Sequence, residues 1–385
     1  MRVVYADNNA TTKVDPLIVA KVTEFLTDKW GNPSSMHAFG GDIEKDVEIA
    51  RSQVAKCLGA SLSTEIVFTS GGTESDNTAI RSALLSRKKR KKIITTRVEH
   101  PAVLNLCKNL EREGYEVRYL PVDNSGNLNL DDLKNAMDDD VALVTVMAAN
   151  NETGVLFPVQ EAGALAHEYG ALFHTDAVQA MGKIPIDLST GNIDLLSVSG
   201  HKIHGVKGVG ALYIKRGTRF RPFIVGGHQE RGRRGGTENV PGVVAMGLAA
   251  ELAQKHLNDE QTRVRALRDR LENEITKIIP KSRINGDKEN RLPGTSNISL
   301  KNVEGEALLL MLDQKGICAS SGSACTSGSL EPSHVLRAMG IPFTFAHGSL
   351  RFSLGRFNTD EDVDAIIEAL PPIVERLREL SPFTD

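Results

Sequence analysis

Apolar, β-branched segments alternate with helical patterns between residues 65 and 214. Strands are expected at 65–69, 92–98, 117–122, 141–148, 171–176, 195–199 and 209–214. Several of these segments are apolar at consecutive positions, which is typical of strands covered on both faces. Helical patterns lie between them, over 73–85, 101–113 and 158–169, and Pro101 and Pro158 suit first-turn helix positions. The alternation predicts an α/β domain built on a mainly parallel, seven-stranded sheet.

The pattern changes after about residue 240. A long charged helical pattern runs to about 277, Pro280 follows it as a stop, and a break at Leu292-Pro293-Gly294 comes next. Then come a strand pattern at 295–300, a helical pattern at 304–314 and a last helix from about 359. We therefore expect a large domain over 15–255 and a smaller α+β domain formed by 1–14 and 256–385.

Composition and charge exclude several classes of protein. The chain has 385 residues, 40% hydrophobic and 25% charged, with a formal net charge of −3, so no overall positive field attracts nucleic acid or an anionic membrane. The basic run from Arg87 to Lys92 contains no aromatic residue and is interpreted as a solvated turn. Neither a signal peptide nor an apolar run near the length of a membrane span is evident. We expect a cytoplasmic protein with neither nucleic-acid nor membrane partners.

The four cysteines do not form a Cys-x-x-Cys pair, and so few in such a long chain do not suggest a disulfide framework or a resident metal site. Cys57, Cys107 and Cys318 are expected to be small buried apolar residues. Cys325 differs, because it lies in a segment of serines, glycines and other small residues over 320–329. Such a segment buries a cysteine poorly and favours a thiol that can move.

Three polar groups follow strand patterns, where ligands bind in open α/β sheets. Residues 70–74 (SGGTE) join a strand to a helix, and they suit either a phosphate site or an ordinary capping turn. Asp176 ends an apolar strand, where it either needs a cationic partner or caps the next helix. Lys202 follows Ser199, Gly200 and His201 and is either a Schiff-base lysine or a surface lysine.

Taken together, these groups are the parts of a pyridoxal-phosphate (PLP) site. The cofactor needs an acid for its pyridine nitrogen, a lysine for the imine and a phosphate cradle. Asp176 and Lys202 are 26 residues apart (202 − 176), enough for one helix and one strand. This spacing places both residues at the same edge of the sheet.

The chain resembles the cysteine desulfurases of the NifS/IscS group, which are class-V aminotransferase-like PLP enzymes of fold type I. The matching segments follow the family order along nearly the whole chain: 5–12 (YADNNATT), 31–35 (GNPSS), 70–75 (SGGTES), 99–100 (EH), 150–154 (NNETG), 174–179 (HTDAVQ), 199–202 (SGHK), 234–239 (RGGTEN), 320–325 (SSGSAC) and 351–353 (RFS). One such segment would be weak, but the ordered set is highly specific.

The resemblance implies a role for each matching residue. Catalytic residues are Cys325, Lys202 and His100. Cofactor-binding residues are Gly72, Thr73, His100, Asn151, Asp176, Gln179, Ser199, His201, Lys202 and Thr237. Substrate-binding residues are Asn8, Asn151 and Arg351, the last gripping the carboxylate. Thr237 is expected to complete the phosphate site of the other subunit, which implies a homodimer.

The resemblance also implies the reaction. L-cysteine becomes L-alanine, and the sulfur stays on Cys325 as a persulfide until an Fe–S scaffold or another acceptor protein takes it. Contact of Cys325 with iron or an Fe–S cluster would be transient. The competing interpretations are a selenocysteine lyase, a related PLP aminotransferase or lyase, and a non-enzymatic sulfur-handling scaffold. The acceptor, the pathway, the docking surface and the base that takes the α-proton are left open by the sequence.

Overall fold

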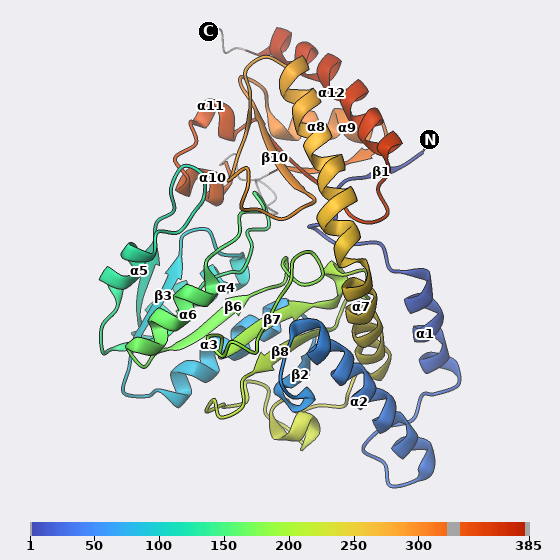
Figure 1. The fold of residues 1–385 in the computed structure, drawn as a ribbon, viewed down its shortest axis with the longest axis vertical. Helices are drawn as coiled ribbons and strands as arrows, with labels where there is room; N and C mark the ends of the chain where they lie inside the picture. Colours follow the sequence, from blue (N-terminus) through green and yellow to red (C-terminus); the bar gives the residue numbers. More distant parts are fainter. Residues whose placement is uncertain (1, 322–331, 382–385) are drawn as a thin grey trace.

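A seven-stranded sheet forms the centre of the larger part of the molecule (Figure 1). The computed structural model describes residues 2–321 and 332–381. The strand order is β2-β8-β7-β6-β5-β3-β4, and β8 runs antiparallel to both of its neighbours while the other pairs are parallel. The strands are β2 (Ile66–Thr69), β3 (Lys92–Thr96), β4 (Glu116–Leu120), β5 (Val141–Thr145), β6 (Leu172–Asp176), β7 (Leu195–Ser199) and β8 (Gly210–Ile214). The predicted mainly parallel sheet is confirmed.

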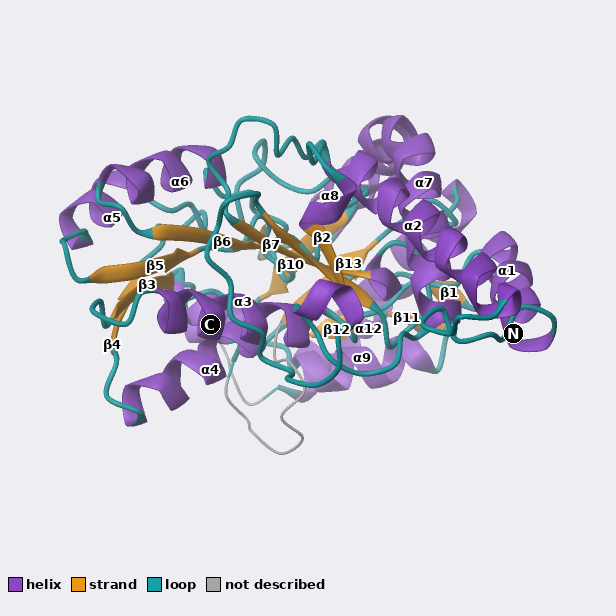
Figure 2. Cartoon of the chain, turned by 90° about the horizontal axis from the view of Figure 1, so that it is seen from below, coloured by secondary structure: helices purple, strands orange, loops and turns teal. Residues whose placement is uncertain are grey.

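Helices cover both faces of this sheet (Figure 2). They are α3 (Gly72–Ser86) and α4 (Pro101–Arg112) on one face, and α5 (Leu130–Ala136) and α6 (Val159–Glu168) on the other. Successive strand residues therefore enter different cores: Ile93 packs with the α3–α4 core and Ile94 with the opposite one. This double burial explains the consecutive apolar positions. Pro101 begins α4 as expected, whereas Pro158 precedes α6 as its N-cap.

A long helical rod joins the two parts of the molecule (Figure 1). It consists of α7 (Val240–Asp259), a π-helical turn (Glu260–Val264) and α8 (Arg265–Ile278). The charged helical pattern predicts this rod, but it gives no indication of the π turn within it. Helices α1 (Pro16–Thr27) and α2 (Ala38–Leu58), which we did not predict, pack against α7. No helix in the described part of the chain combines the length and the apolarity that a bilayer crossing requires.

The second part of the molecule has its own sheet and its own apolar core. A four-stranded antiparallel sheet has the order β12-β13-β10-β9, and β1 pairs in parallel with β11. The elements are β1 (Val4–Tyr5), β9 (Ser282–Ile284), β10 (Thr295–Leu300), α9 (Gly305–Asp313), β11 (Ile317–Cys318), β12 (Ser320–Ser321), α10 (His334–Ala338), α11 (Phe343–Ala346), β13 (Ser349–Ser353) and α12 (Asp360–Leu380). The residues of α10 pack with the core of the large sheet. The domain limits given above stay a prediction.

Candidate active site

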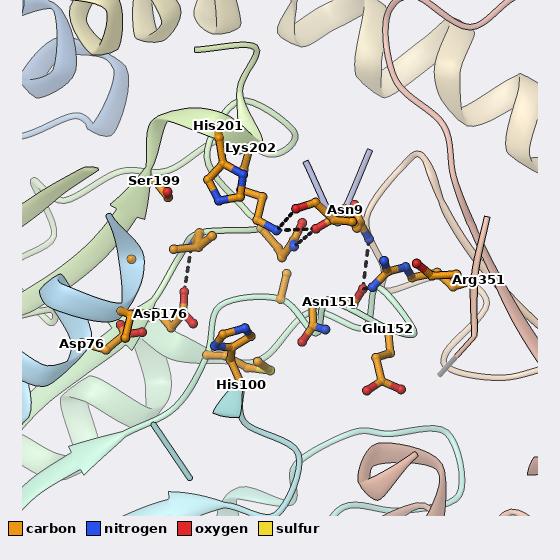
Figure 3. A pocket seen from close by; sticks show the side chains of 18 of the residues that line it. Asn9, Asp76, His100, Asn151, Glu152, Asp176, Ser199, His201, Lys202 and Arg351 are labelled. Carbon is orange, nitrogen blue, oxygen red and sulfur yellow. Dashed lines mark hydrogen bonds between the residues drawn. The ribbon is translucent and has the colours of Figure 1, made fainter. Parts of the chain in front are cut away.

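A cavity of about 500 Å³ lies at the carboxyl ends of the parallel strands (Figure 3). Strands β6 and β7 end in Asp176 and Ser199, and β13 of the second sheet contributes Arg351. The cavity is therefore built from both parts of the molecule. Ten of the predicted site residues line it: Gly72, Thr73, His100, Asn151, Asp176, Gln179, Ser199, His201, Lys202 and Arg351. The volume suits a cofactor-sized ligand.

One end of the cavity is suited to an anion. Helix α3 begins at Gly72 without a side-chain cap, so its first N–H groups are available to a ligand. Gly71 has φ +152°, and a Cβ on Gly72 would lie 2.8 Å from Cγ2 of Val178, so only glycine fits this turn. Burial, together with the charge of Lys202, lowers the pKa of His201 to about 4 and keeps its ring neutral. These features suit a phosphate group.

Two buried carboxyl groups, those of Asp176 and Asp76, lie side by side in the wall of the cavity. Asp176 accepts a hydrogen bond from the Val178 amide at 2.9 Å, and burial raises its pKa, while His100 and Lys202 oppose the rise. Asp76 is fully buried, and both burial and the negative charge of Asp176 raise its pKa. Among the described residues, Oδ1 of Asp76 has no hydrogen-bond partner. The N–H of a cationic ring beside Asp176 would compensate this concentration of acid, so the residues fit a pyridinium nitrogen.

His100 and Lys202 approach the cavity from different elements (Figure 3). His100 caps α4 by accepting from the Ala102 amide at 3.1 Å, and burial lowers its pKa. Lys202 donates from Nζ to the carbonyls of Asn9 at 2.5 Å and Ala10 at 2.8 Å. The Lys202 amine is thus held at the cavity wall by acceptors on the N-terminal segment. This position suits a lysine that bonds covalently to a ligand.

The other end of the cavity carries a guanidinium group. Arg351 is 7% exposed and donates to Oδ1 of Asp7 at 2.7 Å and to the Asn151 carbonyl at 3.0 Å. In the described part of the chain its Nε has no acceptor. Glu152 lies nearby, and burial raises its pKa to about 7, which weakens its competition for the guanidinium. A carboxylate ligand in the cavity would meet this guanidinium group.

The structure does not bring every predicted residue to this cavity. Asn8 lies outside it, because its amide donates to the Ser353 carbonyl at 2.9 Å and to Oδ1 of Asn358 at 3.1 Å. Its neighbour Asn9 lines the cavity instead. Thr237 is exposed and lies away from the cavity of its own chain. Cys325 lies outside the described residues.

The other three cysteines are free thiols, and none lines the cavity. Cys107 is buried as predicted, whereas Cys57 and Cys318 are half-buried rather than fully buried. Burial raises the pKa of Cys57 to about 11 and that of Cys107 to about 12, and it also raises the pKa of Cys318. A thiol with a raised pKa is mostly protonated at neutral pH and is a poor nucleophile.

Several cavity residues were missed by the sequence analysis: Asn9, Asp76, Glu152, Ser320 and Ser321. For Asp76 a signal exists, because it lies on the same helical face as the buried Ala79, Ile80 and Ala83. An acid on the apolar stripe of a helix is unusual and indicates a special environment.

Comparison with known proteins places this geometry in a family. Residues 4–366 match the class-V aminotransferase family, so the chain belongs to that family. Within it, the chain is 60% identical over 383 residues to a cysteine desulfurase of Trichormus azollae, covering 100% of this chain and 96% of the relative. It is 57% identical to the cysteine desulfurase NifS of Azotobacter vinelandii, covering 99% and 94%. A solved NifS-like protein superposes with a TM-score of 0.91 at 40% identity, covering 98% of this chain and 100% of that one. The resemblance to NifS-type cysteine desulfurases is confirmed.

Proposed function

We propose that the protein is a pyridoxal-phosphate-dependent cysteine desulfurase that converts L-cysteine to L-alanine and holds the sulfur on Cys325. The observation that carries the proposal is the meeting of Asp176, Lys202 and Arg351 around one cavity in a chain so similar to cysteine desulfurases. These residues supply an acid for a ring nitrogen, an amine for covalent attachment and a cation for a carboxylate.

The described residues fit the cofactor in a single direction. The start of α3 at Gly72 and Thr73, with Ser199 and His201, would hold the phosphate. Asp176 would keep the ring nitrogen protonated, His100 would cover the ring, and Asn151 and Gln179 would contact its hydroxyl. Lys202 would hold the cofactor covalently. When bound, pyridoxal phosphate supplies an electron sink for negative charge that develops at the substrate Cα.

The protein's own groups would then divide the reaction among them. Arg351 binds and orients the cysteine carboxylate. The amine of Lys202 would take the proton from the substrate Cα. The thiolate of Cys325 attacks the substrate sulfur, so that an S–S bond forms as the C–S bond breaks, and the three-carbon fragment is protonated and leaves as alanine. An Fe–S scaffold or another acceptor protein would later take the sulfur.

A Cys325→Ser variant tests this division. We expect it to bind pyridoxal phosphate with wild-type near-visible absorbance and to respond spectrally to cysteine, because the cofactor residues are unchanged. It should form no persulfide, and alanine release should collapse, because a hydroxyl stays protonated at neutral pH and is a far weaker nucleophile than a thiolate. Mass spectrometry of Cys325 in the wild type should show one added sulfur. Alanine formation by the variant at the wild-type rate would instead indicate a lyase that releases sulfide directly.

We also propose that the active unit is a homodimer, in which Thr237 of each chain reaches the phosphate site of its partner. Exposed apolar side chains support an interface: Trp30 is 70% exposed and contacts Phe39 edge-on, and Met36 and Val225 are also largely exposed. We expect sedimentation to report a dimer. A strictly monomeric protein with full activity would contradict this arrangement. The cytoplasmic location stays a prediction.

A further inference from the structure

Lys183 is a half-buried lysine that the site described above does not use. Its ammonium donates to Oδ1 of Asn9 at 2.9 Å and to Oε1 of Gln179 at 2.8 Å. Asn9 and Gln179 line the active-site cavity, whereas Lys183 does not. Lys183 and Lys202 instead share a smaller cavity of about 20 Å³. Lys183 therefore contacts two cavity residues from behind the cavity wall.

The fold fixes the position of Lys183 through its backbone. The preceding Gly182 has φ +74°, and a Cβ there would lie 2.8 Å from Cβ of Ala253 on α7. The Lys183 carbonyl accepts a hydrogen bond from the side chain of Gln261, in the π turn of the rod. Burial lowers the pKa of Lys183 to about 7, although the Glu260 carboxylate opposes this change. Its hydrogen bonds to Asn9 and Gln179 compensate part of the cost of removing the Lys183 amine from water.

The chemistry of these partners fixes the orientation of the Gln179 amide. The Nζ of Lys183 donates to Oε1 of Gln179, so the amide oxygen of Gln179 faces Lys183. A carbonyl only accepts, so the amide nitrogen of Gln179 faces the carbonyl of Asn9, at 2.9 Å. Both constraints select the same orientation. One amide hydrogen of Gln179 is then left for a ligand in the cavity.

Asn9 is held in the same way and meets Lys202 (Figure 3). Its side-chain oxygen accepts from Lys183, while its side-chain nitrogen donates to Oγ1 of Thr295 at 2.9 Å and to the Asn151 carbonyl at 3.1 Å. Its carbonyl accepts from Nζ of Lys202 at 2.5 Å. A displaced Asn9 would therefore move an acceptor of the Lys202 amine.

We infer that Lys183 is a positioning residue of the active site, which locks Gln179 as a hydrogen-bond donor toward the cavity and holds Asn9 against Lys202. The inference rests on the proposed function, because the ligand oxygen that Gln179 meets is the ring hydroxyl oxygen of pyridoxal phosphate. Lys183 acts through its two neighbours and touches neither cofactor nor substrate.

The test is a Lys183→Met variant, which keeps the length of the side chain and removes its charge. We expect the dissociation constant for pyridoxal phosphate, measured by titrating the apoprotein, to rise at least about tenfold. This rise corresponds to the loss of one hydrogen bond to a charged group. We expect kcat to fall, while KM for cysteine changes little. Combining Lys183→Met with Gln179→Ala should weaken cofactor binding by less than the sum of the two single losses, because Lys183 acts in part through Gln179. Lys92→Met is the matched control: Lys92 is 12% exposed and ion-paired with Asp138 at 2.8 Å, far along β3 from the cavity, and its loss should lower only stability.

A second variant keeps the test decisive if Lys183→Met does not fold. Gln179→Glu retains an acceptor for Lys183 and a similar shape, but its carboxylate donates no hydrogen bond to the ligand or to the Asn9 carbonyl. We expect it to fold and to bind pyridoxal phosphate at least about tenfold more weakly. Wild-type cofactor affinity in Gln179→Glu, or additive losses in the double variant, would overturn the inference about Lys183 and leave the proposed function standing. A wild-type protein that binds no pyridoxal phosphate would overturn the proposed function as well.

Discussion

Replacing Arg351 by lysine separates substrate capture from cofactor binding. Arg351 is buried, lines the cavity, and uses Nη1 and Nη2 on the Asn151 carbonyl and Asp7. Lysine keeps the charge but not the planar fork, so it cannot hold Asp7, Asn151 and a carboxylate in the same arrangement. The expected loss is one hydrogen bond to a charged group, about 1.5–3 kcal/mol.

At about 1.4 kcal/mol for each factor of ten, this loss raises the dissociation constant for cysteine about 10- to 150-fold. The assay follows the spectral change of the bound cofactor as cysteine is added, and steady-state alanine production gives KM in parallel. Affinity for pyridoxal phosphate should stay at the wild-type level, because Arg351 lies at the opposite end of the cavity from Gly72.

The matched control is Arg291→Lys. Arg291 is also a buried arginine, but it pairs with Glu272 through two hydrogen bonds of 2.7 and 2.6 Å and does not line the cavity. This control should lower thermal stability and leave cysteine binding unchanged. If Arg351→Lys binds cysteine as well as the wild type, or loses cofactor and cysteine in equal measure, the assignment of Arg351 to the carboxylate is wrong.

Two further substitutions test the buried acids. Asp176→Asn preserves shape but cannot keep a ring nitrogen protonated, so alanine production should fall about a hundredfold, and near-wild-type turnover would refute the role. For Glu99, burial raises the pKa from an ordinary 4.5 to about 8 in the folded protein. Between pH 4.5 and 8 the carboxyl is therefore ionised in the unfolded chain but protonated in the folded one, so the unfolding free energy of the wild type falls as the pH rises. Glu99→Gln does not titrate, so its unfolding free energy relative to the wild type should rise between pH 4.5 and 8, by on the order of a few kcal/mol. Denaturant unfolding at pH 4.5, 6 and 8.5 measures this difference, and a difference independent of pH would contradict the buried, protonated state of Glu99.

The sequence predicts those elements whose burial leaves a simple pattern. The strands Leu195–Ser199 and Thr295–Leu300 have the predicted bounds, and every residue of both strands is buried. Asp176 and Lys202 were predicted as site residues because Asp176 ends one apolar strand and Lys202 follows the next one. Parallel strands then bring both residues to one edge of the sheet.

Other parts of the site depend on contacts between distant segments. Asn8 and Asn9 are neighbours, and which of them faces the cavity is decided by the hydrogen bonds of Asn8 to Ser353 and Asn358. Lys183 has the local sequence of a surface lysine, and its position behind the cavity comes from the packing of the turn against α7 and the π turn. Neither outcome can be read from the local pattern of residues.

The pairing of β1 with β11 has a consequence for synthesis on the ribosome. Val4 pairs with Ile317. Asp7 binds Arg351, which lies 344 residues further along the chain. Asn9 and Ala10, whose carbonyls hold Lys202, thus leave the ribosome first. Strand β13, which binds this N-terminal segment, leaves among the last. Because domains generally fold as they emerge, the large sheet can form while its cavity still lacks one wall. Cofactor and substrate therefore meet a finished site only after nearly the whole chain has been released, so truncated chains should be unable to perform the chemistry.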